Sequence, residues 1–255
     1  MNFLNLTEHL FAMSFKNITR LYINKELKSN LEVLMDLKDV HYLKNVLRLK
    51  EKNKIRVFNG LNGEWEAIIL SRDCKKVRCI KIRKKQTFTE GPKIYFSLIK
   101  SNNLRWLIEK ATELGVKELN PMITERTNVR NFNHKKALLH IKEASEVSER
   151  LELPKLNRVK PFDEILLDLK KKSEKVIFCN ESRHDIHLAN YFKNNFSKNV
   201  SFIVGPEGGF SEKEIKLIKS YANIKSVKIN DRILKAETAV VLVMSVYNNY
   251  LAIKN

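Results

Sequence analysis

Apolar and polar residues alternate over short runs in the first third of the chain, a period-2 pattern that predicts β-strands. We expect strands at residues 20–23, 55–58, 65–70 and 77–83. Asn59-Gly60 and Asn62-Gly63 separate the second run from the third. Asn-Gly between apolar runs is a strong hairpin signal, because a type I′ turn needs positive φ angles. The pattern therefore predicts a small β-rich unit that contains a hairpin.

One helix and one break interrupt this β pattern. Asp39 can cap a short helix whose apolar residues share one face. These residues are Val40, Leu43, Val46 and Leu47. Residues 84–92 are polar and turn-prone and end in Gly91-Pro92. Such a stretch is typical of a domain boundary, so we place one there.

After Pro92 the pattern changes to apolar runs that alternate with helical spacing. The strand candidates are residues 94–99, 116–123, 176–179, 200–204 and 227–229. The helix candidates are residues 104–114 before Gly115, residues 134–151, a helix starting at Ser211, and residues 236–251. Ser211 and Glu214 have the spacing of a capping box. Strand–helix alternation predicts an α/β fold with a parallel sheet and helices on both of its faces.

Composition adds a strong positive charge. The 255 residues include 48 Lys and Arg against 29 Asp and Glu, for a net charge of +19. Residues 1–90 carry 19 Lys and Arg against 10 Asp and Glu, so the β-rich unit is the more densely basic part. Such an excess attracts polyanions such as nucleic acids. A/T-biased coding also produces lysine-rich chains, so charge by itself leaves both interpretations open.

The sequence favours a cytoplasmic protein. The 3 cysteines form no C-x-x-C pair and are odd in number, which argues against disulfides or a zinc site. The first residues lack the basic segment of a signal peptide. No apolar run reaches the roughly 18–20 residues of a membrane span, and no third ligand accompanies His184 and His187. We therefore expect neither a membrane nor a metal partner.

The sharpest local feature is a glycine-rich turn between a strand and a helix. Residues 202–211 read FIVGPEGGFS, so an apolar strand runs into Gly205, Gly208 and Gly209 and then into the capped helix. Glycine allows positive φ and close approach of a ligand to the backbone. The helix start adds free N–H donors and a partial positive charge. The turn matches neither the dinucleotide fingerprint nor the P-loop, so it indicates another kind of ligand site or a structural turn.

A second polar loop lies between the last strand and the last helix. Residues 229–239 read INDRILKAETA. Asn230 and Asp231 tolerate tight turns, and Glu237 and Thr238 can bind a polar ligand near the helix start. Ordinary loop chemistry also explains this stretch when it is taken alone.

Together the two loops resemble those of the SPOUT methyltransferases, and more narrowly the RsmE family, which methylates N3 of a uridine in 16S ribosomal RNA. Four further stretches match that family in order. They are residues 42–49 (YLKNVLRL), 109–116 (EKATELGV), 121–127 (PMITERT) and 143–150 (EASEVSER). The resemblance covers about residues 18–252. Several motifs in the same order identify a family more specifically than any single motif does.

The resemblance implies a fold and a reaction that periodicity does not reveal. It implies an extension at residues 1–17, a PUA-like RNA-binding β-barrel at residues 18–88, and a SPOUT methyltransferase domain with a trefoil knot at residues 92–255. It also implies a homodimer, S-adenosyl-L-methionine as methyl donor, and 16S ribosomal RNA in the assembled 30S subunit as substrate. The alternatives are an RNA-binding module without catalysis, and a methyltransferase that acts on tRNA or on a ribose 2′-oxygen.

By this resemblance, the two loops and one further strand end hold the cofactor. The expected cofactor-binding residues are Glu181, Val204, Gly205, Pro206, Glu207, Gly208, Gly209, Ile229, Asn230, Ile233, Leu234, Ala236, Glu237, Thr238 and Ala239. Two positions depart from the family pattern, because Ile229-Asn230 replaces the usual Leu-Gly and Lys235 replaces the usual Arg. Asn230 can adopt the left-handed conformation that Gly would take, so the first change is tolerable. Lys235 keeps the charge but lacks the planar guanidinium of Arg, so the resemblance does not extend to a bidentate contact there.

Methyl transfer to uracil N3 requires loss of the imide proton and stabilisation of the resulting charge. The catalytic candidates are Arg126, Glu207 and Arg232. The two arginines can stabilise the anion or hold phosphate, and Glu207 can act as the base or accept the charge of the cofactor. A structural ion pair with Glu125 or with a neighbouring helix is the alternative for Arg126. The expected RNA-binding residues, whose alternative is a solvated surface, are Arg20, Lys44, Arg48, Lys81, Arg83, Lys84, Lys85 and Arg126.

Overall fold

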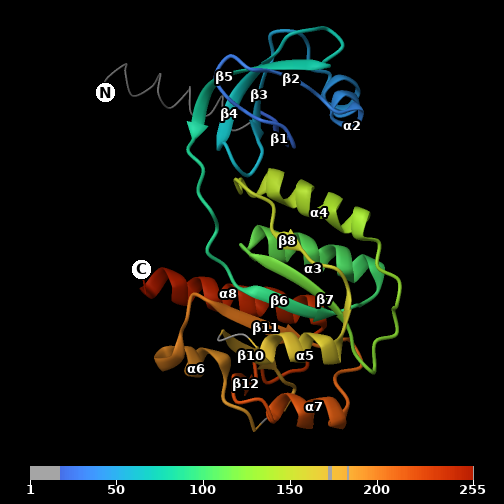
Figure 1. Ribbon diagram of the computed structural model, residues 1–255, viewed down its shortest axis with the longest axis vertical. Helices are drawn as coiled ribbons and strands as arrows, with labels where there is room; N and C mark the ends of the chain where they lie inside the picture. Colours follow the sequence, from blue (N-terminus) through green and yellow to red (C-terminus); the bar gives the residue numbers. More distant parts are fainter. Residues whose placement is uncertain (1–17, 172–173, 183, 255) are drawn as a thin grey trace. The chain divides into compact units, whose positions relative to one another are not determined.

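The computed structural model describes residues 18–171, 174–182 and 184–254 (Figure 1). The chain forms two compact units that divide between Phe88 and Thr89. Each unit has its own sheet and its own hydrophobic core, as domains do. The expected extension at residues 1–17 lies outside the described residues.

The first unit is a mixed sheet of short strands. Within residues 18–88 they are β1 (Arg20–Tyr22), β2 (Glu32–Leu34), β3 (Lys54–Phe58), β4 (Glu64–Ile69) and β5 (Lys76–Lys84). They lie in the order β1-β3-β4-β5-β2, with β1 parallel to β3 and the other pairs antiparallel. The alternation in the sequence is confirmed for β1, β3, β4 and β5. The three-residue β2 was not predicted, because it is too short to show a period.

The β3–β4 hairpin is confirmed, but its turn is wider than predicted. The side-chain oxygen of Asn59 accepts hydrogen bonds from the backbone N–H groups of Leu61 and Asn62, at 2.9 and 2.8 Å. Positive φ falls on Gly60 and Gly63, at 82° and 78°, and not on two adjacent residues as a type I′ turn requires. The two glycines therefore serve a wider loop around the Asn59 side chain.

The short helix of the first unit begins earlier than predicted. It spans Leu37–His41 as α2 and continues as a π-helical turn, η1 (Tyr42–Val46). Asp36 occupies the N-cap position, and Asp39 lies buried in the first turn, so Asp39 is not the cap. Its carboxylate still favours the helix, because it lies near the positive end of the helix dipole. Leu43 of the predicted apolar face is fully buried.

The second unit is built on a parallel sheet (Figure 1). In its described residues the strands are β6 (Lys93–Ser97), β7 (Glu118–Ile123), β8 (Lys155–Leu156), β9 (Lys160–Pro161), β10 (Lys175–Cys179), β11 (Val200–Val204) and β12 (Ile224–Val227). They lie in the order β12-β10-β11-β6-β7-β8, and β9 also pairs with β7. These pairings are parallel, which confirms the predicted α/β class.

Helices cover both faces of this sheet. In the described chain they are α3 (Ser101–Glu113), α4 (His134–Val147), α5 (Phe162–Lys170), α6 (Leu188–Asn195), α7 (Glu212–Lys219) and α8 (Ala236–Lys254). Successive strand residues point to opposite faces, so Phe202 packs with α3, α6 and α8, whereas Ile203 packs with α5 and α7. Burial on both faces explains why the central strands are mainly apolar in the sequence.

The end of α4 differs from the prediction. The helix ends at Val147 rather than at residue 151, and Glu149 then takes a positive φ of 59°. The buried Arg150 that follows donates to the carbonyl oxygens of Thr112 and Val116 at the end of α3, at 3.0 and 2.8 Å. The chain therefore leaves the helix early so that Arg150 can satisfy carbonyl groups of a neighbouring helix.

Further differences lie toward the C-terminus. The strand β12 (Ile224–Val227) ends where the predicted strand at residues 227–229 begins, and the short α5 and α6 were not predicted. Among the described helices, α8 has the length and apolarity of a membrane span, contrary to the expectation that no run is long enough. Its residues Val240, Val243, Met244 and Tyr247 are fully buried in the core of the second unit. This burial is typical of the core helix of a globular domain.

Candidate active site

The strands β10, β11 and β12 lie side by side and run in the same direction. Their register places Phe178 beside Ile203 and Cys179 beside Val227, so the strands end at the same edge of the sheet. Ligands of open parallel sheets bind at this carboxyl edge. The chain segments that leave it are residues 180–182, 205–211 and 228–235.

The glycine-rich turn after β11 is tightly closed. The N–H of Gly209 donates to the carbonyl oxygen of Pro206 at 3.0 Å, and Gly209 has a φ of 66°. A Cβ atom on Gly205 would lie 2.7 Å from the ring of Phe210, so position 205 has no room for a side chain. Phe210 packs edge-on against Phe178, with ring centroids 5.1 Å apart. The turn is therefore anchored to the sheet through an aromatic contact.

The predicted capping box fixes the other end of this turn. The Ser211 hydroxyl accepts from the N–H of Glu214 at 3.3 Å, and the Glu214 carboxylate accepts from the N–H of Ser211 at 2.9 Å. The second oxygen of Glu214 accepts from the N–H of Glu125 at 2.9 Å. The next residue, Arg126, donates to the carbonyl oxygen of Gly208 at 3.3 Å. A buried carboxylate thus joins the turn to the loop after β7.

A polar network joins the ends of β10 and β12. The side-chain amide of Asn180 donates to the carboxylate of Asp185 at 2.7 Å, and the hydroxyl of Ser226 donates to the same oxygen at 2.6 Å. Next to Asn180, the carboxylate of Glu181 would lie 3.7 Å from a Cβ atom on Gly209. Glu181 therefore lies beside the glycine-rich turn.

The loop before α8 is held by local polar contacts. The Asn230 side chain accepts from the N–H of Arg232 at 3.2 Å, and Lys228 forms an ion pair with Asp231 at 2.9 Å. The helix begins at Ala236. The first N–H groups of a helix have no partner within it, and they carry the positive end of its dipole. This helix start therefore offers donors for a ligand at the sheet edge.

These loops enclose a cavity of about 200 Å³. The expected residues that line it are Glu181, Val204, Gly205, Pro206, Gly208, Gly209, Ile229, Asn230, Ile233, Leu234, Ala236 and Ala239. Further lining residues, not expected as binding residues, are Phe178, Cys179, Asn180, Phe210, Ile215 and Asp231. An aromatic residue directly after the glycine-rich turn is the one sequence signal that points to Phe210. Phe178 and Ile215 reach the cavity through tertiary packing, which leaves no local signal.

Three expected cofactor contacts do not line the cavity: Glu207, Glu237 and Thr238. Glu207 is exposed, and its carboxylate lies 3.5 Å from the N–H of Lys100 at the start of α3. Glu237 is buried in the first turn of α8, and its Oε2 has no hydrogen-bond partner among the described residues. Thr238 is exposed.

The two arginines proposed from the sequence reach the cavity from different loops. Arg126 follows β7 and Arg232 precedes α8, and both line the cavity with exposed side chains. In the described part of the chain, Arg126 forms no ion pair with Glu125, the structural alternative considered for it. Two guanidinium groups beside one cavity can stabilise an anion that develops on a bound base.

Cys179 contributes a neutral thiol to the cavity wall. Burial raises the pKa of this thiol to about 12. The thiolate, not the thiol, is the nucleophile, so little reactive form is present near neutral pH. Cys179 is therefore suited to packing against a ligand rather than to covalent chemistry.

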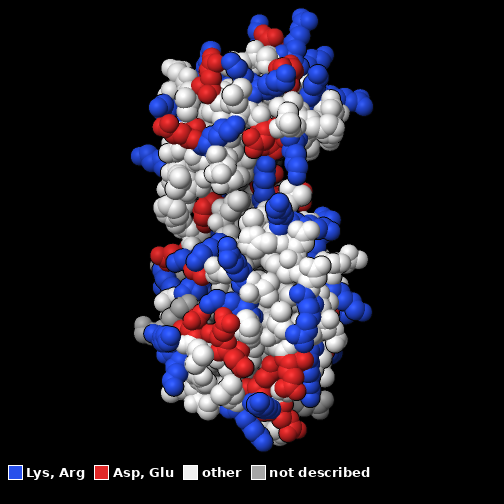
Figure 2. Space-filling model, turned by 45° about the vertical axis from the view of Figure 1, so that its right-hand side comes forward, with Lys and Arg blue, Asp and Glu red and all other residues white. Residues whose placement is uncertain are grey.

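The basic residues expected to bind RNA form separate groups in the first unit. Those exposed at and after the end of β5 are Lys81, Arg83, Lys84 and Lys85. Those exposed in and after η1 are Lys44 and Arg48. The end of β5 and the α2 helix lie on opposite sides of this unit in Figure 1. On the face drawn in Figure 2, Lys and Arg side chains are scattered in small groups, with acidic groups between them.

Arg20 differs from the other expected RNA contacts. It is 5% exposed, and its Nε lies 2.5 Å from the carboxylate of Glu64. Its guanidinium also lies over the ring of Phe58, 3.6 Å from the centroid. The side chain is thus held inside the first unit, which favours a structural role, and its contact with RNA stays a prediction.

Two family models match the chain. One, described as an RNA methyltransferase domain, matches residues 90–248, and one described as an RNA methyltransferase PUA domain matches residues 36–82. The ribosomal RNA small subunit methyltransferase E of Rickettsia conorii is 34% identical over 87% of this chain and 91% of its own length. The protein of the same name from Bacillus subtilis is 30% identical over 81% of this chain and 86% of its own length.

Solved structures show the same architecture. A putative methyltransferase from Legionella pneumophila, in complex with the bound cofactor SAM, has a TM-score of 0.80 at 25% identity and covers 91% of this chain and 98% of its own. A ribosomal RNA small subunit methyltransferase E from Neisseria gonorrhoeae has the same TM-score and coverage at 22% identity. The likeness supports an α/β domain that carries a PUA-type unit at its N-terminus.

Proposed function

Because the chain belongs to the ribosomal RNA small subunit methyltransferase E family, we propose that it is a 16S rRNA (uracil-N3)-methyltransferase that uses S-adenosyl-L-methionine. Membership of the family makes it an RNA methyltransferase, as the sequence resemblance implied. The choice of uracil N3 as the acceptor is the finer part of the proposal. The observation that supports a cofactor-dependent methyltransferase is the convergence of three loops on one cavity at the carboxyl edge of β10, β11 and β12.

The residues around the cavity fit S-adenosyl-L-methionine, which combines an aromatic base, hydroxyl groups, a carboxylate and positively charged groups. Phe178, Ile233 and Leu234 offer apolar surface, and Glu181 offers a carboxylate. Backbone N–H groups of the glycine-rich turn and of the first turn of α8 supply donors. The unpartnered Oε2 of Glu237 is a further acceptor close to these donors along the chain. Glu237 does not line the cavity, so its contact with the cofactor stays a prediction.

When bound, the cofactor supplies an electrophilic methyl group. The side chains of this chain then have to hold the uridine out of any stack and accommodate loss of the N3 proton. We assign stabilisation of the uracil anion to Arg126 and Arg232, which line the cavity from two sides. Glu207 is our candidate for accepting the proton, because its exposed carboxylate belongs to the glycine-rich turn.

The proposal extends to partners. We propose a homodimer in which α8 contributes to the interface, because the apolar side chains of Val241 and Leu242 remain half-buried on it. The substrate is then 16S rRNA in the assembled 30S subunit, and the reaction takes place in the cytoplasm, where that particle is found. The trefoil knot implied by the resemblance stays a prediction.

Mass spectrometry of RNA from cells that lack the gene tests this proposal. We expect 16S rRNA to lose 3-methyluridine and to regain it when the wild-type gene is returned. Unchanged 16S rRNA together with a lost tRNA or ribose mark would show that the acceptor is wrong. Calorimetry with S-adenosyl-L-methionine distinguishes the proposed enzyme from an RNA-binding module without catalysis. The enzyme should give binding heat, and the module should give none.

A further inference from the structure

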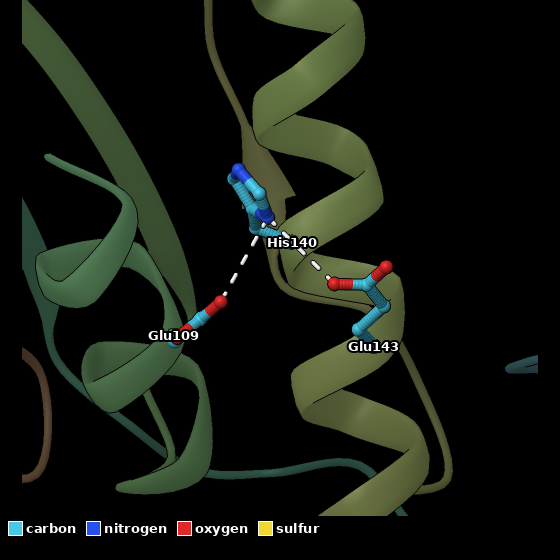
Figure 3. Close-up of side chains that lie close together, drawn as sticks. All are labelled: Glu109, His140 and Glu143. Carbon is cyan, nitrogen blue, oxygen red and sulfur yellow. Dashed lines mark ion pairs between the residues drawn. The ribbon is translucent and has the colours of Figure 1, made fainter. Parts of the chain in front are cut away.

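A cluster of metal-ligating side chains lies between α3 and α4, in the described part of the second unit (Figure 3). Glu109 comes from α3, and His140 and Glu143 come from successive turns of α4. One ligand atom from each residue lies within 4.8 Å of the others. We propose that these residues bind a divalent transition metal ion of the Zn²⁺ type, which joins the two helices.

His140 is the observation that distinguishes this cluster from an ordinary group of surface carboxylates. It is 7% exposed, and its Nδ1 has no hydrogen-bond partner among the described residues. Figure 3 shows the ring directed toward two carboxylates, Glu143 on its own helix and Glu109 on the neighbouring one. A buried ring nitrogen without a partner costs free energy, so a site that leaves it open calls for a ligand.

The distances favour a metal ion over a direct hydrogen bond. The Nδ1 atom lies 3.8 Å from Oε1 of Glu109 and 3.7 Å from Oε2 of Glu143. A charged imidazole that donates to a carboxylate lies about 2.7–2.9 Å from it. Zinc ligands lie about 2.0–2.2 Å from the metal, so ligand atoms around one ion are roughly 3–4 Å apart. The observed separations match the second arrangement.

Charge and ligand type indicate which ion fits. Two carboxylates balance the charge of a divalent ion, and neutral imidazole suits zinc, whereas Mg²⁺ prefers oxygen ligands and retains its water. Arg105 competes for Glu109, since its Nε donates to Oε1 at 2.6 Å. Its side chain is 58% exposed and can move to the other oxygen of that carboxylate. Glu143 is 50% exposed, so the ion can enter from solvent on that side.

The sequence did not reveal this site. Its expectation of no metal rested on the cysteines and on His184 and His187, two histidines with helical spacing. His140 and Glu143 have that spacing too, but Glu109 lies on a different helix and joins them only through folding. The ion would tie α3 to α4 within the second unit.

Metal titration of the full-length protein, stripped beforehand with a chelator, tests the proposal. In competition with a chromophoric chelator, we expect one Zn²⁺ per chain and a thermal midpoint that rises with Zn²⁺ but not with Mg²⁺. Glu143→Gln should weaken Zn²⁺ binding by about 10-fold or more, because it removes a charged ligand. That residue lies on the exposed side, so the variant should fold, and circular dichroism checks this. The matched control is His184→Ala, which removes an exposed histidine elsewhere and should leave the affinity unchanged.

Two results would overturn the proposal. One is wild-type protein that binds no Zn²⁺ at millimolar concentration. The other is equal Zn²⁺ affinity in wild type, Glu143→Gln and His140→Gln. The absorption spectrum of the Co²⁺-substituted protein provides a second readout. The nitrogen and oxygen ligands proposed here give no intense charge-transfer band, whereas cysteine thiolates do. Such a band would show that the ion binds to a cysteine instead.

Discussion

The ring of Phe210 occupies the space that a side chain at Gly205 would need, since a Cβ atom there would lie 2.7 Å from Cε2 of the ring. The two residues bracket the turn that follows β11, and both line the cavity. Phe210 also packs on Phe178 and Phe162, with centroids 5.1 and 5.5 Å away, so it cannot retreat freely. The shape of the cofactor loop is therefore set by an aromatic contact as well as by glycine conformation.

Gly205→Ala should disturb this turn. Forcing a methyl group against a packed ring typically costs about 1–3 kcal/mol, and the displaced turn should weaken S-adenosyl-L-methionine binding by about 10-fold or more. Calorimetry and thermal unfolding measure the two effects. The matched control is Gly208→Ala, whose Cβ would lie 3.4 Å from the Arg126 side chain and should alter stability far less. Unchanged cofactor affinity in Gly205→Ala would show that the loop can adjust.

Arg232→Ala should separate catalysis from cofactor binding. If Arg232 stabilises the uracil anion, methyl transfer should fall by about 100-fold, while the Kd for S-adenosyl-L-methionine changes by less than about 3-fold. Single-turnover transfer to 30S particles and calorimetry give the two values. Lys225→Ala removes an exposed positive charge from β12 and serves as the control for net charge. Full methyl transfer by Arg232→Ala would remove this residue from the catalytic set.

The Cys179 thiol should make stability depend on pH in the alkaline range. Its pKa is raised from 9.0 to about 12 by burial, so the folded state holds the proton more tightly than the unfolded state. The resulting stabilisation is complete below pH 9 and is lost as pH rises from 9 toward 12. The loss is at most about 1.4 kcal/mol per pH unit. Denaturant unfolding of wild type and Cys179→Ala at pH 8 and pH 10 measures it, and a difference that is independent of pH would contradict it.

The basic groups of the first unit should contribute unequally to RNA binding. A continuous RNA backbone that contacts the end of β5 cannot reach the opposite side of the unit as easily. We expect the denser group at β5 to contact the RNA. The triple variant Lys81→Ala, Arg83→Ala, Lys85→Ala should therefore reduce the slope of log K for RNA binding against log salt concentration by about 0.9 per lost phosphate contact. Lys44→Ala with Arg48→Ala is the comparison. The reverse order of effects would place the RNA on the α2 side.

The elements that could be predicted from the sequence are those whose burial is simple. β10 and β11 are buried on both faces over most of their length, so each is mainly apolar, and Ser211 with Glu214 gives a local capping signal. Short elements such as β2 and α6 escaped prediction, because their stability comes mainly from tertiary packing. The same division holds for the site. The glycine-rich turn is visible in the sequence, whereas the contribution of Phe178 depends on the register between neighbouring strands.

Arg20 shows why charge in a sequence does not identify a binding surface. Its partner Glu64 lies 44 residues away, so no local pattern reveals the buried pair. Breaking such a pair leaves a buried charge unpaired and typically costs about 3–5 kcal/mol. Arg56, whose Nη1 lies 3.7 Å from the other oxygen of Glu64, should offset part of this cost.

Arg20→Ala should therefore lower stability without lowering the RNA affinity of the folded protein. We expect a loss of about 3 kcal/mol in the unfolding free energy of the first unit, against less than about 0.5 kcal/mol for the exposed control Lys81→Ala. Replacing both partners, as in Arg20→Met with Glu64→Leu, should recover only part of the stability, because the carboxylate is no longer left unpaired but Arg56 loses its ion pair with Glu64. RNA binding is compared at a temperature where every variant is folded. Wild-type stability together with weakened RNA binding in Arg20→Ala would contradict this prediction. It would mean that the Arg20 guanidinium leaves Glu64 at little cost in free energy, as it must in order to contact RNA phosphate.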